Sequence, residues 1–385
     1  MPQLLSRHRV PRGIDVQLRV DPASPLDWRW QLRHSVSSVE QLSARLRLTP
    51  EEQQGAERAA SQGFPIGITP YYFDLIDPED PSCPIRRQVV PSAEEATEVP
   101  GDLRDPLGEE AHSPAPELVQ RYPDRALLLV TDQCAVYCRF CTRSRMVGAG
   151  EGPRPDQRLE PALAYLKSHP EVRDVILSGG DLLSMATSRI KRVVESVRAI
   201  PSVETIRLAT RVPVVLPMRI DTELLDALRP FHPLWVMTHF NHPKELTPEA
   251  RAGLNRLADA GFPVMNQSVL LRGVNDRAET LEALFRGLIR ERVRPYYLLQ
   301  ADPVRGTGHL RTPLDVGLGI MEQLQGRLTG IAVPKFIVDT PGGMGKVPVL
   351  PEWVVSRRAA TDVAPGSTTL RTWRGVEVDY IDPPL

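Results

Sequence analysis

Apolar, β-branched runs alternate with helix-like segments over residues 126–299. The runs expected to form strands are residues 126–131, 174–177, 205–209, 234–238, 264–271 and 294–299. The intervening segments expected to form helices are residues 157–169, 187–199, 221–228, 248–260 and 278–291. This alternation predicts an α/β fold, with a parallel sheet covered by helices and closed or partly closed into a barrel. Six strands are too few for the full eight-stranded barrel, and a doubly wound open sheet is the alternative.

The rest of the chain lacks this alternation and divides into three regions. Residues 1–26 hold four prolines among scattered arginines and are expected to form a flexible arm. Residues 27–120 are expected to begin with helices, one capped by Ser38 or Ser37 and another starting at Thr49-Pro50, and to continue as a Pro- and acid-rich segment that wraps other elements. The barrel is assigned to residues 121–346, and residues 347–385 form a short C-terminal segment.

Polar residues follow the predicted strands, and in a parallel arrangement these strand ends gather at one rim. A cysteine loop follows the first strand, Ser178-Gly-Gly-Asp181 the second, and Thr210-Arg211 the third. His239 follows the fourth strand and Asp302 the sixth. Gly179 and Gly180 are expected to let backbone amides approach a small zwitterion, although an ordinary turn is the simpler interpretation of this loop.

The cysteine loop carries the clearest chemistry. Cys134, Cys138 and Cys141 have the spacing C-x3-C-x2-C, and the only other cysteine is Cys83. Iron–sulfur cubanes usually take four thiolates, so three predict a cluster with one iron open to another ligand. A zinc knuckle would need a fourth Cys or His, and the nearest candidate, His112, lies more than about twenty residues away. An open cluster is therefore favoured over zinc or incidental thiols.

Lys346 ends a glycine-rich loop, 341–346, that is not a nucleotide-binding P-loop, because Val347 stands where Ser or Thr is required. An amine on an open loop suits covalent attachment to the aldehyde of pyridoxal phosphate (PLP). The alternative is that a lysine simply lies on the protein surface, and this interpretation suits Lys167, Lys191 and Lys244. Lys335, at the start of an apolar run, is the one serious rival.

Composition excludes several classes of function. With 385 residues and a formal net charge of −1, the chain gives no electrostatic reason to bind nucleic acid or an anionic membrane. No apolar run reaches transmembrane length, and the Arg-bearing N-terminus lacks the apolar core expected of a secretory signal. A cysteine triplet plus one single cysteine is not a disulfide framework. A reducing, cytoplasmic location is expected, because an oxygen-sensitive cluster would be a liability outside it.

Several longer motifs, taken in order, resemble the lysine 2,3-aminomutases, a family of radical S-adenosylmethionine (SAM) enzymes that also use PLP. Besides the cysteine loop, these motifs are the segments 121–125, 177–181, 238–243, 266–276 and 341–346. The resemblance as a whole runs from about residue 27 to the C-terminus. The resemblance implies a partial (β/α)6 radical SAM barrel with an N-terminal helical extension. It also implies a [4Fe–4S] cluster, SAM and PLP as cofactors.

The resemblance assigns a role to each matched residue. Cys134, Cys138 and Cys141 would bind the cluster, and Ser178, Gly179, Gly180, Asp181, His239 and Gln267 would contact SAM. Lys346 would carry PLP, which Arg121, Tyr122, Arg125 and Tyr296 would line. Arg143 would bind the substrate carboxylate, and Asp302 and Asp339 the distal ammonium group.

The implied reaction is migration of the α-amino group of L-lysine to the β carbon, giving β-lysine. Two acids for one ammonium argue against an acidic substrate, whereas arginine or ornithine would also satisfy them. An iron–sulfur electron carrier and a radical SAM enzyme that consumes SAM on a macromolecule are the competing interpretations. An electron donor of the flavodoxin or ferredoxin type and a homo-oligomer, dimer or tetramer, are further expectations. Better-known members carry zinc-binding cysteines towards the C-terminus, but this chain has none after Cys141, so zinc is not expected.

Overall fold

The sheet at the centre of the chain contains nine strands in sequential order, within the residues that the computed structural model describes: 24–62, 64–148 and 152–384. Strands β2 to β8 run parallel, while β1 and β9 pair antiparallel at the two ends. Their bounds are β1 Leu118–Tyr122, β2 Arg125–Thr131, β3 Asp174–Gly179, β4 Thr205–Ala209, β5 Leu234–Thr238, β6 Val264–Leu270, β7 Val293–Gln300, β8 Lys335–Thr340 and β9 Gly345–Pro348. The predicted partial barrel is confirmed. The six predicted strands are β2 to β7, and β8 extends the parallel series by one.

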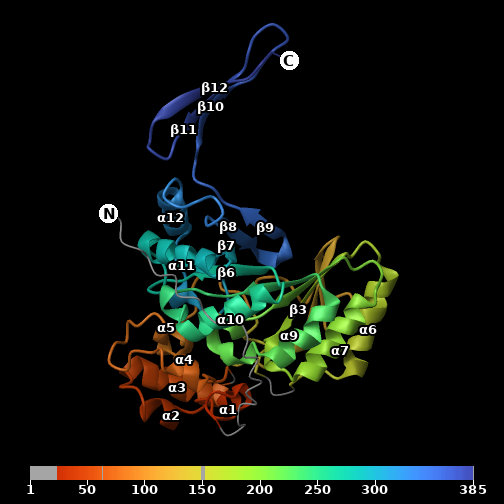
Figure 1. Cartoon of the computed structure of the whole chain (residues 1–385). Coiled ribbons are helices and arrows are strands. Elements are labelled where there is room, and N and C mark those ends of the chain that lie inside the picture. The colour runs from red at the N-terminus through yellow and green to blue at the C-terminus, as the bar shows by residue number, and fades with distance from the viewer. Residues whose placement is uncertain (1–23, 63, 149–151, 385) are drawn as a thin grey trace, which may run out of the picture.

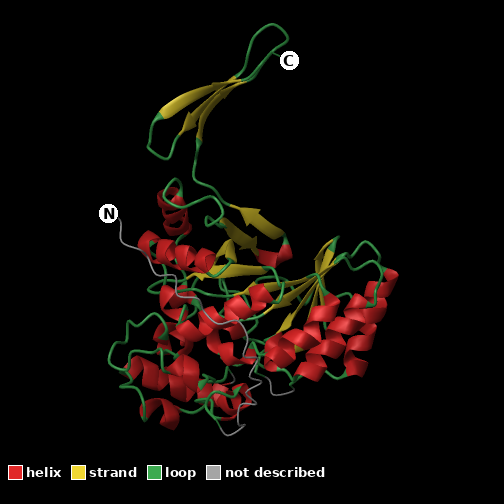
Figure 2. Cartoon of the chain, viewed as in Figure 1, coloured by secondary structure: helices red, strands yellow, loops and turns green. Residues whose placement is uncertain are grey.

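Helices pack on the outer side of this curved sheet (Figures 1 and 2). The five predicted helices form within one or two residues of the expected bounds, and α12 was not predicted. They are α6 Asp156–Ser168, α7 Thr187–Arg198, α9 Thr222–Leu228, α10 Pro248–Asp259 and α11 Ala278–Arg290, joined by α12 Leu314–Leu324 and the short α8 Val212–Val215. Local chemistry sets their starts: the Asp221 carboxylate caps α9 by accepting from Leu224 N at 2.8 Å, and Thr247 caps α10.

Alternation along the strands gives the sheet two different faces. On β3, Val175 and Leu177 are fully buried in the main core, whereas the intervening Ile176 lines a cavity. Successive side chains of a strand point to opposite faces, so one face packs under the helices and the other encloses the interior of the barrel. This arrangement places the candidate site inside the curve of the sheet.

The N-terminal region forms short helices. They are α1 Trp28–Arg33, α2 Val39–Ser43, α3 Pro50–Gln62, α4 Pro70–Phe73 and α5 Arg86–Val89. Ser38 caps α2, and Thr49 forms reciprocal side-chain bonds with Glu52 at the start of α3. Most of the arm predicted for residues 1–26 lies outside the described residues.

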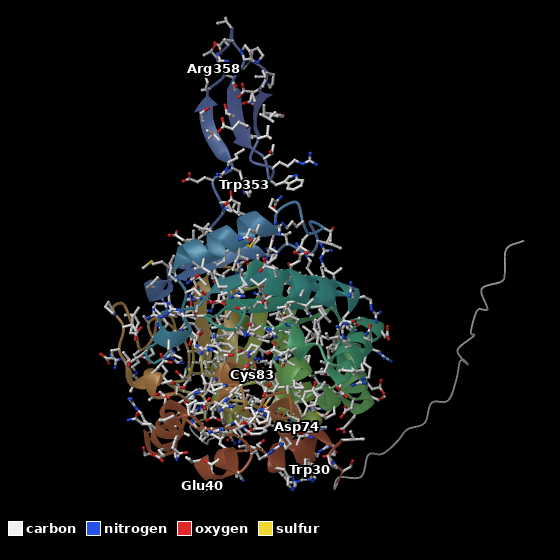
Figure 3. All side chains as sticks on the ribbon, turned by 90° about the vertical axis from the view of Figure 1, so that its left-hand side faces the viewer. Trp30, Glu40, Asp74, Cys83, Trp353 and Arg358 are labelled. Carbon is white, nitrogen blue, oxygen red and sulfur yellow. The ribbon has the colours of Figure 1, made fainter. Side chains whose placement is uncertain are left out.

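The C-terminal segment forms a second sheet, which hydrophobic patterning did not predict. Its antiparallel strands are β10 Val354–Arg358, β11 Ser367–Arg371 and β12 Glu377–Ile381. The sheet projects from the body, and Figure 3 places Trp353 and Arg358 along it. Arg371 pairs with Glu322 of α12 at 3.2 Å, which ties the sheet to the barrel. No helix in the described ranges is long and apolar enough to cross a membrane.

Candidate active site

Two cavities of about 250 and 280 Å³ meet inside the barrel. The first contains Lys346, and the second contains the cysteine loop. They share part of their lining, namely Thr142, Arg143, Ser178, Ala209, Met237, Gln267, Leu299 and Asp302. A reactive group in one cavity is therefore adjacent to a molecule held in the other.

Cys134, Cys138 and Cys141 all line the second cavity, immediately after β2. Burial, reinforced by the charge of Asp181, raises the pKa of the Cys134 thiol well above its ordinary value. Burial and the neighbouring Cys138 raise the pKa of Cys141 to about 11. Buried thiolates need a positive partner, and iron provides one, so these side chains fit the expected cluster.

The loop 178–181 packs directly against the backbone of the cysteine loop. Gly179 has φ +114°, and a Cβ there would lie 2.2 Å from Thr131 O. The amide of Gly180 donates to that same carbonyl at 2.6 Å, and the amide of Asp181 donates to Gln133 O at 2.7 Å. The amides of Gly180 and Asp181 are thus bonded within the protein, and contact of this loop with SAM stays a prediction. The glycines permit close approach of the two loops.

The Asp181 carboxylate also accepts hydrogen bonds from neighbouring residues at the same end of the barrel. It accepts from Thr210 Oγ1 and from the Arg211 amide, both at 2.6 Å. Burial raises the pKa of Asp181 despite these donors. The side chain thus fixes the ends of β3 and β4 relative to each other.

His239, which directly follows β5, and Gln267 of β6 contribute polar groups to the second cavity. The His239 Nε2 is buried without a hydrogen-bond partner among the described residues. Burial, together with the charge of Arg211, lowers the pKa of His239 to about 3, so the ring is neutral. An unpartnered buried nitrogen fits a site that receives a polar ligand.

Lys346 lies on β9 in register with Asp339 of β8, and its ammonium bonds to that carboxylate. Its backbone amide donates to the Tyr122 hydroxyl at 2.8 Å. Lys346 lines the first cavity, whereas the rival Lys335 is exposed at the start of β8. A lysine amine that lines a cavity together with Arg121 and Arg125 suits attachment of PLP, whose phosphate the arginines can bind.

The four side chains expected around PLP line this same cavity: Arg121, Tyr122, Arg125 and Tyr296. Arg121 forms a two-pronged pair with Asp339, with N–O distances of 3.0 and 3.2 Å. Arg125 lies over the Tyr122 ring at 4.4 Å and bonds to Asp124. The barrel therefore brings together residues that are separated by more than 200 positions.

The three residues expected to bind substrate also meet here. Arg143 bonds through Nε to Glu109 at 2.8 Å, and Asp302 accepts from Thr142 Oγ1 at 3.0 Å. Burial, then the nearby Asp339 carboxylate, raises the pKa of Asp302 to about 6. Burial opposes ionisation of Asp339 as well, but its contacts with Arg121 and Lys346 outweigh this effect and lower its pKa.

Sequence reasoning missed Glu109 and left Arg211 without a role. Arg211 donates to Cys138 Sγ at 2.6 Å and pairs with the fully buried Glu245 at 2.9 Å. The position of Arg211 just after the third predicted strand was the sequence signal that could have identified it. Glu109 lies in a segment without periodicity, so no sequence signal marked it.

Two family models match separate parts of the chain. The model described as "Radical SAM superfamily" matches residues 128–284, and that described as "Lysine-2,3-aminomutase" matches residues 321–384. The first covers the cysteine loop and most of the parallel strands.

Curated relatives match over nearly the whole chain. The L-lysine 2,3-aminomutase of Fusobacterium nucleatum is 46% identical over 93% of this chain and 82% of that protein. The Clostridium subterminale enzyme of the same name is also 46% identical, over 93% and 84%. A glutamate 2,3-aminomutase from Clostridioides difficile is 39% identical over 93% and 84%. The chain therefore belongs to the lysine 2,3-aminomutase family of radical SAM isomerases, whose cofactors are a [4Fe–4S] cluster, SAM and PLP.

Proposed function

We propose that this chain is a PLP-dependent 2,3-aminomutase that converts L-lysine to β-lysine. One observation carries the proposal: Asp302 and Asp339 line the same cavity as Lys346 and Arg143. A molecule attached near Lys346 would meet a cation at one side and two acids at another. This pattern complements an amino acid with a carboxylate and a distal ammonium group.

The two halves of the site have separate tasks. Cys134, Cys138 and Cys141 would hold the cluster, and Ser178, His239 and Gln267, with the loop 179–181, would contact SAM. Lys346 would hold PLP, with Arg121, Tyr122, Arg125 and Tyr296 around it. When bound, these groups supply a radical able to abstract an unactivated hydrogen and a covalent tether through which nitrogen can migrate.

The residues of the chain supply placement. Arg143 would pair with the substrate carboxylate in the region shared by both cavities, which directs the β carbon towards the SAM side. Asp302 and Asp339 would fix the far end of the substrate. The apolar Leu299 and Met237 line both cavities and keep water from the reacting carbon.

Charge in the first cavity supports this assignment. Its described lining contains the cations Arg121, Arg125, Arg143, Arg207 and Lys346, and the anions Glu109, Asp302 and Asp339. The excess of positive charge suits a phosphate dianion, for which arginine is the usual partner. Asp302, whose donor is only the Thr142 hydroxyl, remains for a cationic side chain, and Asp339 would join it once Lys346 has moved from it. Glutamate would face these carboxylates with a like charge.

Lysine is proposed over arginine and ornithine because the most similar of the relatives described above carry the name L-lysine 2,3-aminomutase. A longer, planar guanidinium would also pair with two carboxylates. A cytoplasmic location, a homo-oligomer and a flavodoxin- or ferredoxin-type electron donor remain proposals. The division at residues 26, 120 and 346 is also a proposal, although the observed sheet spans Leu118 to Pro348.

The test is anaerobic incubation of the reconstituted enzyme with lysine, arginine, ornithine or glutamate, each followed by analysis for β-amino acids. We expect β-lysine to form fastest, with SAM left unconsumed. If no β-amino acid forms while 5′-deoxyadenosine accumulates in proportion to SAM loss, the chain is a SAM-consuming enzyme instead. A chain that binds the cluster but neither SAM nor PLP would be an electron carrier.

A further inference from the structure

Residues 102–112, here called the strap, cross two loops of the candidate site. The Leu103 amide donates to Pro303 O at 2.8 Å, and Arg305 N donates back to Leu103 O at 3.1 Å. These bonds attach the strap next to Asp302. Further along, Gly342 N donates to Pro106 O at 2.9 Å, which attaches it to the loop preceding Lys346.

The second attachment depends on close backbone contact. Gly108 has φ +61°, and a Cβ there would lie 3.0 Å from the Gly342 carbonyl. Across the contact, a Cβ on Gly343 would lie 2.7 Å from Leu107 O. Glycine on both sides therefore sets the height of the strap above the cavity.

This position directs Glu109 onto Arg143. The Glu109 side chain is 4% exposed, and its Oε1 accepts from Arg143 Nε at 2.8 Å and contacts Nη2 at 2.7 Å. Its Oε2 accepts from Arg145 Nη2 at 3.0 Å. Burial alone would raise the pKa of Glu109, but Arg143 and Arg145 lower it, so the carboxylate is ionised at neutral pH.

The contact uses one edge of the Arg143 guanidinium. A guanidinium has five N–H groups in a fixed plane, so an anion on the Nε edge sets the direction of the Nη1 edge. We propose that Glu109 is a positioning residue that orients Arg143 to bind the α-carboxylate of the substrate and keeps it from pairing with Asp302. The inference rests on the proposed function, in which Arg143 binds the carboxylate of an amino acid.

Separation of charges is what this contact achieves. Arg143 and Asp302 both line the region shared by the two cavities. Were Arg143 to swing onto Asp302, the site would lose its carboxylate-binding and ammonium-binding groups together. Glu109 instead gives Arg143 a hydrogen-bonded carboxylate partner at 2.8 Å.

The test measures equilibrium binding of L-lysine and L-lysinamide to PLP-loaded protein without reductant, by calorimetry. Lysinamide lacks only the carboxylate charge. Glu109→Gln should weaken lysine binding about tenfold and leave lysinamide within about twofold, since a charge-assisted contact is lost. Glu109→Asp should recover part of the affinity, and the exposed Glu110→Gln is the matched control.

Each other outcome is decisive. Unchanged lysine binding by Glu109→Gln would overturn the inference, and tighter binding would show that Glu109 competes with substrate. Equal loss of lysine and lysinamide in both Glu109 variants would assign it a merely structural role. A wild-type protein that prefers lysine to lysinamide but forms no β-lysine refutes the proposed function alone. β-Lysine formation with an unaffected Glu109→Gln refutes the inference alone.

Discussion

Replacing Asp302 by Asn should abolish the pH dependence of lysine use between pH 5 and 7. Asp302 bonds to Thr142, and burial with the nearby Asp339 raises its pKa to about 6. Because the proposed ligand is an ammonium group, only the ionised carboxylate binds it well. Affinity is therefore present above pH 6 and lost as pH falls through that value, the opposite of what burial of a neutral ligand would give.

The size of the effect follows from this pKa. At pH 8 about 99% of Asp302 is ionised, and at pH 5 about one tenth, so kcat/KM for lysine should fall about tenfold over this range. The carboxamide introduced by Asp302→Asn cannot ionise, so this variant should show a flat profile. Its kcat/KM at pH 8 should be about 30- to 150-fold below wild type, as expected for about 2–3 kcal/mol from one partner of a buried charge pair.

The same substitution, Asp302→Asn, should increase the stability of the fold although it lowers kcat/KM. A carboxyl whose folded pKa lies above its unfolded value stabilises the folded chain least at high pH, where burial of its charge is unfavourable. Asp302→Asn should therefore raise the free energy of unfolding at pH 8 by about 3 kcal/mol and have little effect near pH 4.

The assay is anaerobic initial-rate measurement of β-lysine from pH 5 to 8, with the exposed Asp226→Asn as control. Urea unfolding of both variants at pH 8 and pH 4 supplies the stability measurement. An Asp302→Asn enzyme that keeps the wild-type profile with lysine would refute the ammonium assignment.

Three further experiments test other parts of the structure. Lys346→Ala should remove the absorbance band of covalently bound PLP, whereas Lys335→Ala should retain it; the reverse result would move the attachment site. Cys138→Ala should lower the iron content of anaerobically purified protein by at least about half, and a full complement of iron would contradict the ligand assignment. On α12, Gly317→Ala should destabilise the fold by about 1–3 kcal/mol because its Cβ would lie 2.1 Å from a core phenylalanine ring, while Gly319→Ala, with nothing within 4 Å, should stabilise it by about 0.5–1 kcal/mol. Urea unfolding distinguishes the two, and equal effects would refute the packing argument.

The barrel was predictable because its information is local. Each of the predicted strands is a continuous apolar run of the length of a buried strand. Capping residues such as Asp221 and Thr247 mark helix starts. Strand order followed the chain order, so the ends of consecutive strands met where expected. The cysteine loop and Lys346 were identifiable because rare residues stood in distinctive spacings.

The strap and the C-terminal sheet were not predictable in the same way. The strap has no helix or strand period, and bonds to loops about 200 positions away hold it in place. Glu109 therefore became visible only through its contact with Arg143. In β10 and β12 every residue is exposed, so alternation between buried and exposed positions is missing.

The pairing of charges in the first cavity explains why Asp302 should decide substrate choice. Asp339 is held by both Arg121 and Lys346, and Glu109 is held by arginines. Asp302 instead has a hydroxyl donor, and its raised pKa records that its negative charge is only partly compensated. A ligand cation gains most from the anion that is least neutralised, and a ligand anion is repelled most by it. Discrimination between lysine and glutamate should therefore reside mainly in Asp302, with Asp339 stabilising the ammonium once Lys346 has moved from it.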